Sequence, residues 1–137
     1  MKKIALILIL LLLTLRSGCF SSDPKLAKSM TEKYSNNGSY VSLSGEIIKC
    51  HEKSIVIKCE ELKDYIGYED DTCEYFICSD QVLVLTEGEK IDFVTVPYHF
   101  YNGHELPIVE LRTNTSTLLK FEDGREYLIR WVNDTFG

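Results

Sequence analysis

The four cysteines from Cys50 onward are the residues whose spacing most directly suggests chemistry. Cys50 and Cys59 flank a polar turn, and Cys73 and Cys78 lie on one predicted strand. Cys73 and Cys78 cannot pair with each other, because extended chain at ~3.3 Å per residue holds them about 16 Å apart. If the second and third strands are antiparallel, Cys59 pairs with Cys73 and Cys50 with Cys78. The alternative is four free, mostly buried thiols that act as small apolar side chains.

A second candidate site is the run Tyr98-His99-Phe100-Tyr101-Asn102-Gly103-His104. Asn102-Gly103 favours a tight hairpin turn, because both residues tolerate positive φ. In a ligand site at this tip, Phe100 and Tyr101 could stack on a sugar ring or a peptide side chain, with His99 or His104 supplying hydrogen bonds. The alternative is that the aromatic residues simply cover one end of a barrel.

The sequence contains no G-x-S-x-G elbow, no H-E-x-x-H and no phosphate-binding glycine loop. The cysteines also lack the two-residue spacing of a zinc knuckle, so we expect no metal and no cofactor. These absences favour a binding protein. The alternative is a small envelope enzyme, either a hydrolase or a thiol oxidoreductase, that uses Cys73 or Cys78.

The chain is acidic, with 15 basic and 21 acidic residues and a net charge of −6. Removal of residues 1–18 leaves 12 basic and 21 acidic residues, a net charge of −9. Nucleic-acid binding normally needs a basic patch, and no cluster of basic residues is visible. We therefore expect no nucleic-acid partner.

The first 19 residues have the three parts of an export signal. Lys2-Lys3 precede an apolar run from Ile4 to Leu13, and the small residues Ser17-Gly18 precede Cys19. The apolar run is shorter than the roughly 20 residues of a membrane span. We therefore expect an extracytoplasmic protein.

Ser17-Gly18-Cys19 resembles the lipobox of bacterial lipoproteins. The resemblance implies that the signal peptide, residues 1–18, is removed and that Cys19 becomes a lipid-modified N-terminus carrying fatty acyl chains such as palmitate. Such a lipid would hold the protein on the cell membrane. The alternative is cleavage by an ordinary signal peptidase near this point, which gives a secreted protein.

Residues 19–39 are predicted to form a lipid-anchored flexible linker, with a brief helix from Asp23 to Tyr34, because they lack clear apolar periodicity. Residues 40–137 are predicted to form one β domain. Period-two alternation predicts a strand from Tyr40, followed by strands over 55–59, 73–79, 90–100 and 105–113, with a helical turn within 60–72.

A two-residue turn at Asn102-Gly103 predicts the register of the last two of these strands: Val94 faces Leu111, Val96 faces Val109, and Tyr98 faces Pro107. A bulge is expected near Pro97, because proline cannot donate to the ladder. At the end of the chain the pattern fits either a strand followed by a helix that begins at Asp123, or a hairpin at Asp123-Gly124. We favour the terminal helix.

Gly45-Glu46-Ile47 in the first strand and Glu87-Gly88-Glu89-Lys90-Ile91 at the fourth resemble the oligonucleotide/oligosaccharide-binding (OB) barrel. The chain as a whole resembles small bacterial lipoproteins with an OB-fold-like β-barrel domain. This resemblance implies a mainly β protein with a small five-stranded barrel, and a binding module for an envelope protein or glycan.

Overall fold

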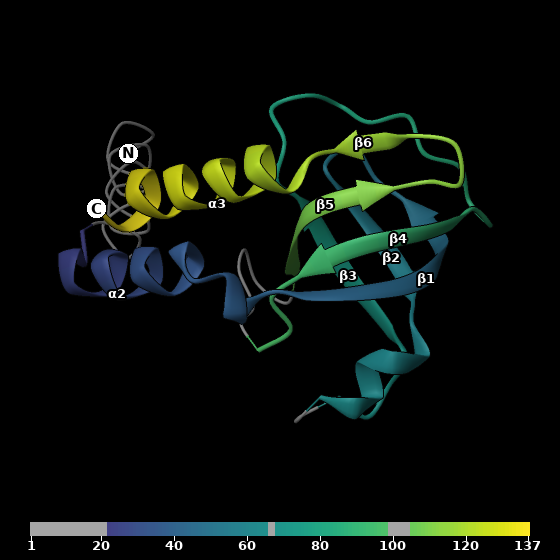
Figure 1. Cartoon of the computed structure of the whole chain (residues 1–137), viewed down its shortest axis with the longest axis horizontal. Coiled ribbons are helices and arrows are strands. Elements are labelled where there is room, and N and C mark those ends of the chain that lie inside the picture. Colours follow the sequence, from purple (N-terminus) through teal and green to yellow (C-terminus); the bar gives the residue numbers. More distant parts are fainter. Residues whose placement is uncertain (1–21, 66–67, 99–104) are drawn as a thin grey trace, which may run out of the picture.

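The computed structural model describes residues 22–65, 68–98 and 105–137 (Figure 1). Its elements, in chain order, are helix α2 (Pro24–Ser35), a 3-10 turn (Asn37–Ser39), strands β1 (Val41–Cys50) and β2 (Ser54–Lys58), a 3-10 helix (Glu60–Asp64), strands β3 (Thr72–Ile77), β4 (Lys90–Thr95), β5 (Leu106–Arg112) and β6 (Thr117–Leu119), and helix α3 (Phe121–Phe136). Within these described ranges, none of the helices is long and apolar enough to cross a membrane.

Strands β1 to β5 form a closed barrel. β1, β2 and β3 form an antiparallel meander, β4 pairs with the other edge of β1, and β5 pairs with β4. Closure comes from a parallel pairing between β3 and β5, in which Tyr75 lies opposite Leu106. The structure is therefore the mainly β, five-stranded OB-like barrel that the sequence predicts, with β6 added at the outer edge of β5.

Gly45 lies near the middle of the long strand β1, which pairs with β2 along one edge and with β4 along the other. A Cβ at this position would lie 2.6 Å from Ile57 Cγ2 and 2.6 Å from the Lys58 carbonyl oxygen. The strand can therefore approach β2 closely only without a side chain here. The irregularity in the β1–β2 ladder lies a little further along, between Ile47 and Lys49.

Two apolar clusters stabilise the molecule. The first fills the barrel interior and includes Ile47, Tyr75, Phe93 and Leu111. The second lies outside the barrel, where the helices cover β4 and β5, and its fully or almost fully buried members are Ala27, Tyr34, Phe76, Cys78, Val94, Val96, Val109, Leu128 and Val132. The end of β4 is thus buried on both faces, with Phe93 in the barrel interior and Val94 under the helices, whereas Lys90 and Asp92 near its start are exposed.

The predicted β4–β5 register is wrong by one residue up to Val94 and by two residues at Thr95, which lies opposite Ile108. Leu111 lies opposite Phe93 rather than Val94, and the ladder shifts between Val94 and Thr95. The expected bulge therefore lies earlier than Pro97, which follows the end of β4. The buried Thr95 hydroxyl explains this position, because it donates a hydrogen bond of 2.6 Å to the Pro107 carbonyl oxygen. The predicted turn at Asn102-Gly103 lies outside the described residues.

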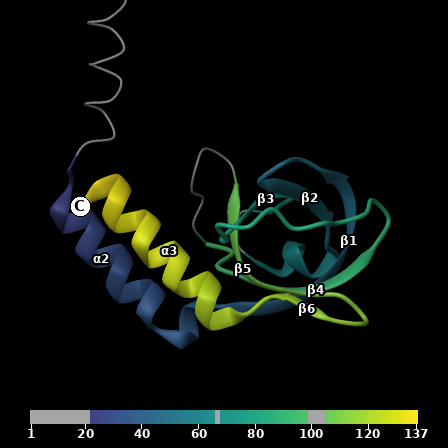
Figure 2. The same cartoon turned by 90° about the horizontal axis from the view of Figure 1, so that it is seen from above.

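The flexible linker predicted over residues 19–39 needs correction, because residues 24–35 form a packed helix. The brief helix expected from Asp23 to Tyr34 is confirmed: Asp23 caps α2 by accepting a 3.1 Å hydrogen bond from the Leu26 N–H. Ala27 and Tyr34 are buried, and α2 lies beside α3 (Figure 2). The folded unit therefore includes α2 and does not begin at residue 40.

The predicted terminal helix is confirmed, but it begins at Phe121, and its N-cap residue is Lys120 rather than Asp123. Leu128 and Val132 are buried on the face predicted from the sequence. Gly124 lies directly on the backbone of Val109 in β5, so that α3 and the barrel approach each other without a side chain between them.

Candidate functional site

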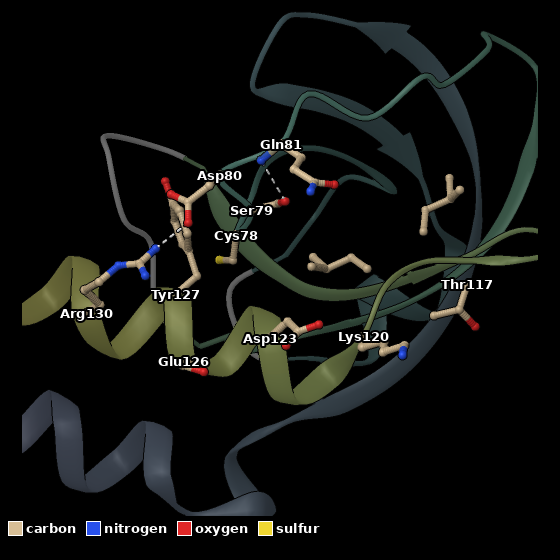
Figure 3. A pocket seen from close by; sticks show the side chains of 12 residues that line it. Cys78, Ser79, Asp80, Gln81, Thr117, Lys120, Asp123, Glu126, Tyr127 and Arg130 are labelled. Carbon is tan, nitrogen blue, oxygen red and sulfur yellow. Dashed lines mark hydrogen bonds and ion pairs between the residues drawn. The ribbon is translucent and has the colours of Figure 1, made fainter.

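A cavity lies between the barrel and α3. It has a volume of about 360 Å³ and is bordered by residues 78–81 after β3, by β6 and by α3 (Figure 3). The lining side chains that matter most for its chemistry are Asp80, Lys120, Asp123, Glu126 and Arg130. Sequence reasoning did not identify this cavity, because its walls come from segments about forty residues apart that only the fold brings together.

Residues 78–81 form a wall that is fixed by polar contacts. An Arg130 Nη2 to Asp80 Oδ2 ion pair of 2.7 Å joins the wall to α3, and the same contact raises the pKa of Arg130. On the barrel side, Lys53 Nζ donates to the Ser79 carbonyl oxygen at 3.1 Å. The Gln81 N–H donates to Ser79 Oγ at 3.1 Å. The cavity is therefore mostly polar and could hold a small polar group or a side chain of a ligand.

The predicted aromatic site falls largely on residues that the structure does not describe. His99, Phe100, Tyr101 and His104 all lie outside the described residues. Tyr98, which precedes them, is 55% exposed.

The described residues before this run are held against the segment that joins β2 to β3. The Tyr98 ring packs edge-on against Tyr65, with centroids 5.6 Å apart. The Tyr68 hydroxyl donates to the Pro97 carbonyl oxygen. The structure thus places Tyr65 against Tyr98, the residue that precedes the predicted site in the sequence.

The four cysteines from Cys50 onward are free thiols in the structure. Cys59 and Cys73 contact the same barrel cluster, but Cys73 lies opposite Ile57, and the Cys59 N–H bonds to the Asp71 carbonyl oxygen at 2.7 Å. The fold does not bring Cys50 and Cys78 together. Cys50 packs against the barrel interior, whereas Cys78 belongs to the cluster under α3.

Burial raises the pKa of each of these thiols. The pKa of Cys73 rises to about 11, and that of the completely buried Cys78 lies well above its usual range. Burial also raises the pKa values of Cys59 and Cys50, and the carboxylates of Glu87 and Glu89 raise the Cys50 value further. A nucleophilic thiol needs a lowered pKa, so the described environment opposes thiol catalysis.

Alkylation of the folded protein by iodoacetamide tests this conclusion. Cys73 is expected to react slowly at neutral pH and faster as the pH rises toward about 11, because the thiolate is the reacting form. Peptide mass spectrometry over a pH series measures the rate at each cysteine, and the same series in urea gives the rates of exposed thiols. A cysteine that reacts faster at neutral pH in the folded protein than in urea would contradict the prediction.

A second, more open groove of about 630 Å³ lies over β1, β4 and the 3-10 helix. It is charged, with carboxylates from Glu46, Glu60, Glu61 and Asp92 and ammonium groups from Lys58 and Lys90. Within residues 22–65, 68–98 and 105–137, no three His, Cys, Asp or Glu side chains are grouped so that they could hold a metal ion.

The fold and cavities define a small OB-like β-barrel domain with a helical pair on one side. No known protein family and no curated protein matches the chain. Among solved structures, it is similar to a Cu(II)-bound tryptophan-to-alanine variant of CusF from Escherichia coli, at 16% identity over 58% of this chain and 96% of that chain, with a TM-score of 0.42. It is also similar to Ag(I)-bound CusF, at 15% identity over 55% and 97% of the two chains, with a TM-score of 0.41. Sequence identities and TM-scores this low give no information about the ligands of this chain.

Proposed function

We propose that this chain is an exported binding domain, held at the extracytoplasmic face of the cell membrane by a lipid on Cys19, whose ligand is an envelope protein. The observation that supports the anchor most strongly is the N-terminal pattern. Lys2-Lys3, the apolar run and Ser17-Gly18-Cys19 follow the order of a lipoprotein signal. Two or three acyl chains give durable membrane attachment, because each buried methylene contributes about 0.8 kcal/mol.

The position of α2 supports a short connection to this anchor. Asp23, the N-cap of α2, is only four residues beyond Cys19, which allows about 14 Å of extended chain. Beyond it, the 12 residues of α2 extend about 18 Å along α3 toward the barrel. In this proposal the helical pair, rather than a flexible linker of about twenty residues, separates the barrel from the membrane.

The chemistry of the described sites supports binding rather than catalysis. The thiols have raised pKa values, and in the cavity beside α3 the Asp80 carboxylate is paired with Arg130. A polar cavity with fixed walls next to a closed barrel suits recognition of a ligand.

Intact-mass measurement on protein extracted from the membranes of an expressing bacterium tests the anchor. The expected mass is that of residues 19–137 plus a diacylglyceryl group, with or without a further acyl chain. A mature chain that begins elsewhere and has no added lipid would overturn the proposal.

A glycan ligand is a second candidate, favoured by the exposed Tyr98 ring packed against Tyr65. Aromatic rings of this kind bind the apolar faces of sugars. Titration with a soluble N-acetylglucosamine hexamer tests it. Tyr98→Ala is expected to weaken binding about tenfold, equivalent to roughly 1.4 kcal/mol, and Leu26→Ala, at an exposed leucine on α2, is the control. Equal affinity of the wild type and Tyr98→Ala, or no binding, would exclude this candidate.

A further inference from the structure

Residues 82–86, between β3 and β4, form a segment that packs on the barrel without belonging to its sheet. Leu83 and Leu85 pack against the barrel cluster. The alternate residues face solvent, with Val82 59% and Val84 90% exposed. Alternation of this kind is the pattern of a strand with one buried face. The segment is here named the docking strand.

The backbone of the docking strand is almost entirely unpaired. None of the N–H groups from Val82 to Thr86 donates a hydrogen bond within the described part of the chain, which includes the whole segment. Of its carbonyl oxygens, only those of Leu85 and Thr86 accept one, from Cys50 Sγ and the Glu89 N–H. An extended row of free donors and acceptors is a template for pairing with another strand.

Contacts at both ends hold the docking strand in place. Before it, Lys53 Nζ bonds to the Ser79 carbonyl oxygen at 3.1 Å, and the Arg130–Asp80 ion pair joins this region to α3. After it, the Gly88 N–H donates to the Ile47 carbonyl oxygen at 2.7 Å. The strand is therefore positioned before any ligand binds, which lowers the entropic cost of pairing.

We propose that the docking strand binds an extended segment of a partner protein by strand addition, and that this segment combines β-branched residues with lysine or arginine. This inference deepens the proposed envelope-protein ligand and rests on it for the identity of the partner. Five residues at ~3.3 Å each offer about 17 Å of backbone for pairing. Val82 and Val84 lie on the exposed side, where apolar side chains of the partner can cover them.

The charges at the ends of the docking strand favour a basic partner. Glu87 and Glu89 follow the docking strand, whereas Asp80 before it is already paired with Arg130. Lys53 also lies at that first end, so the attraction for a basic residue is concentrated at the glutamate end. A second copy of this chain is a poor occupant, because each copy has a net charge of −6 or lower.

The test uses the full chain in detergent and a fluorescein-labelled peptide, acetyl-Lys-Val-Thr-Val-Thr-Lys-amide. Binding is measured by fluorescence polarisation, and amide hydrogen exchange is followed at residues 82–86. The peptide is expected to bind and to slow exchange at least tenfold at alternate amides of this segment, because only every second N–H of an extended chain faces the added strand. Val82→Ser with Val84→Ser is expected to weaken binding at least tenfold. Leu26→Ser, at a 41% exposed leucine on α2, is the control and is expected to leave binding unchanged.

Two further peptides test the mode of binding. A version with N-methyl groups on alternate residues cannot pair its backbone, and a version with glutamate in place of lysine reverses its charge. Both are expected to bind at least tenfold more weakly. Equal binding of either version, no binding of the parent peptide, or concentration-dependent dimerisation that Val84→Ser abolishes would each overturn the inference. Because the anchor is tested by mass, its failure would be recognised separately from failure of the docking strand.

Discussion

Replacing Gly124 by alanine is expected to destabilise the protein by about 2–3 kcal/mol, although the same change inside a helix normally stabilises. A Cβ at this position would overlap the carbonyl group of Val109 in β5. The obstacle is backbone rather than a flexible side chain, so relief requires α3 to move away from the barrel. Such a movement would open the cluster that contains Leu128 and Val132. The steric cost therefore exceeds the gain of about 1 kcal/mol in helix propensity.

Urea denaturation followed by Trp131 fluorescence measures this effect. Trp131 is the single tryptophan, and it lies on α3 against Phe76, so its emission reports detachment of the helix. At a typical slope of 1–3 kcal/mol/M, the midpoint should fall by about 0.7–3 M.

Gly88→Ala is the matched control for this substitution. Gly88 has a φ of 87° with nothing within 4 Å of an added Cβ, so alanine there should cost only about 1 kcal/mol of backbone strain. A Gly124→Ala protein as stable as the wild type would contradict the close approach of α3 to β5.

The barrel strands could be predicted from the sequence because their period-two alternation is local. β1 is an example: Leu43 and Ile47 are buried, and Ser42 and Ser44 are exposed, as the alternation requires. The β4–β5 register could not be predicted in the same way. The register depends on where the ladder shifts. Nothing in the sequence indicates that the buried Thr95 hydroxyl bonds to the Pro107 carbonyl oxygen at this point.

The helices show why local patterns fail where packing decides. α2 has only a sparse apolar stripe, of which Ala27 and Tyr34 are buried and Met30 is partly buried. In the sequence alone so few apolar residues are typical of a polar linker, and their role becomes clear only from their packing against α3. In α3, Gly124 favoured a turn when read locally, yet the structure needs it inside a helix because Val109 lies against it.

The same distinction between local sequence pattern and packing applies to the candidate sites. The cysteines and the aromatic run could be selected by residue type, but their environments could not. Burial of Cys78 under α3 and the raised pKa of Cys73 depend on the complete fold. The Arg130–Asp80 pair joins residues 50 positions apart, and no sequence motif links them. The docking strand has a local signal, since Val82-Leu83-Val84-Leu85 alternates in burial, but its unpaired backbone is visible only in three dimensions.

Replacing Cys19 by serine is expected to remove the protein from the membrane fraction. Serine has no thiol to receive the diacylglyceryl group, and a chain without acyl groups loses the roughly 0.8 kcal/mol that each buried methylene supplies. The folded part offers little to replace this attachment, because the chain is acidic and anionic headgroups repel it. Immunoblots of membrane and soluble fractions from an expressing bacterium measure the distribution, with more than about nine-tenths expected in the membrane for the wild type and in the soluble fraction for the variant.

Two further variants make the result decisive. Cys50→Ser makes the same change at a thiol on the barrel and should leave the protein in the membrane fraction. The apolar run from Ile4 to Leu13 could itself retain an uncleaved Cys19→Ser chain. The second variant therefore combines Cys19→Ser with an ordinary cleavable secretory signal in place of residues 1–18, and intact mass verifies that this signal has been removed. Release of this protein together with retention of Cys50→Ser assigns membrane attachment to the Cys19 thiol. Retention of the correctly cleaved serine variant would show that residues after 19 bind the membrane, and the lipid anchor would be refuted.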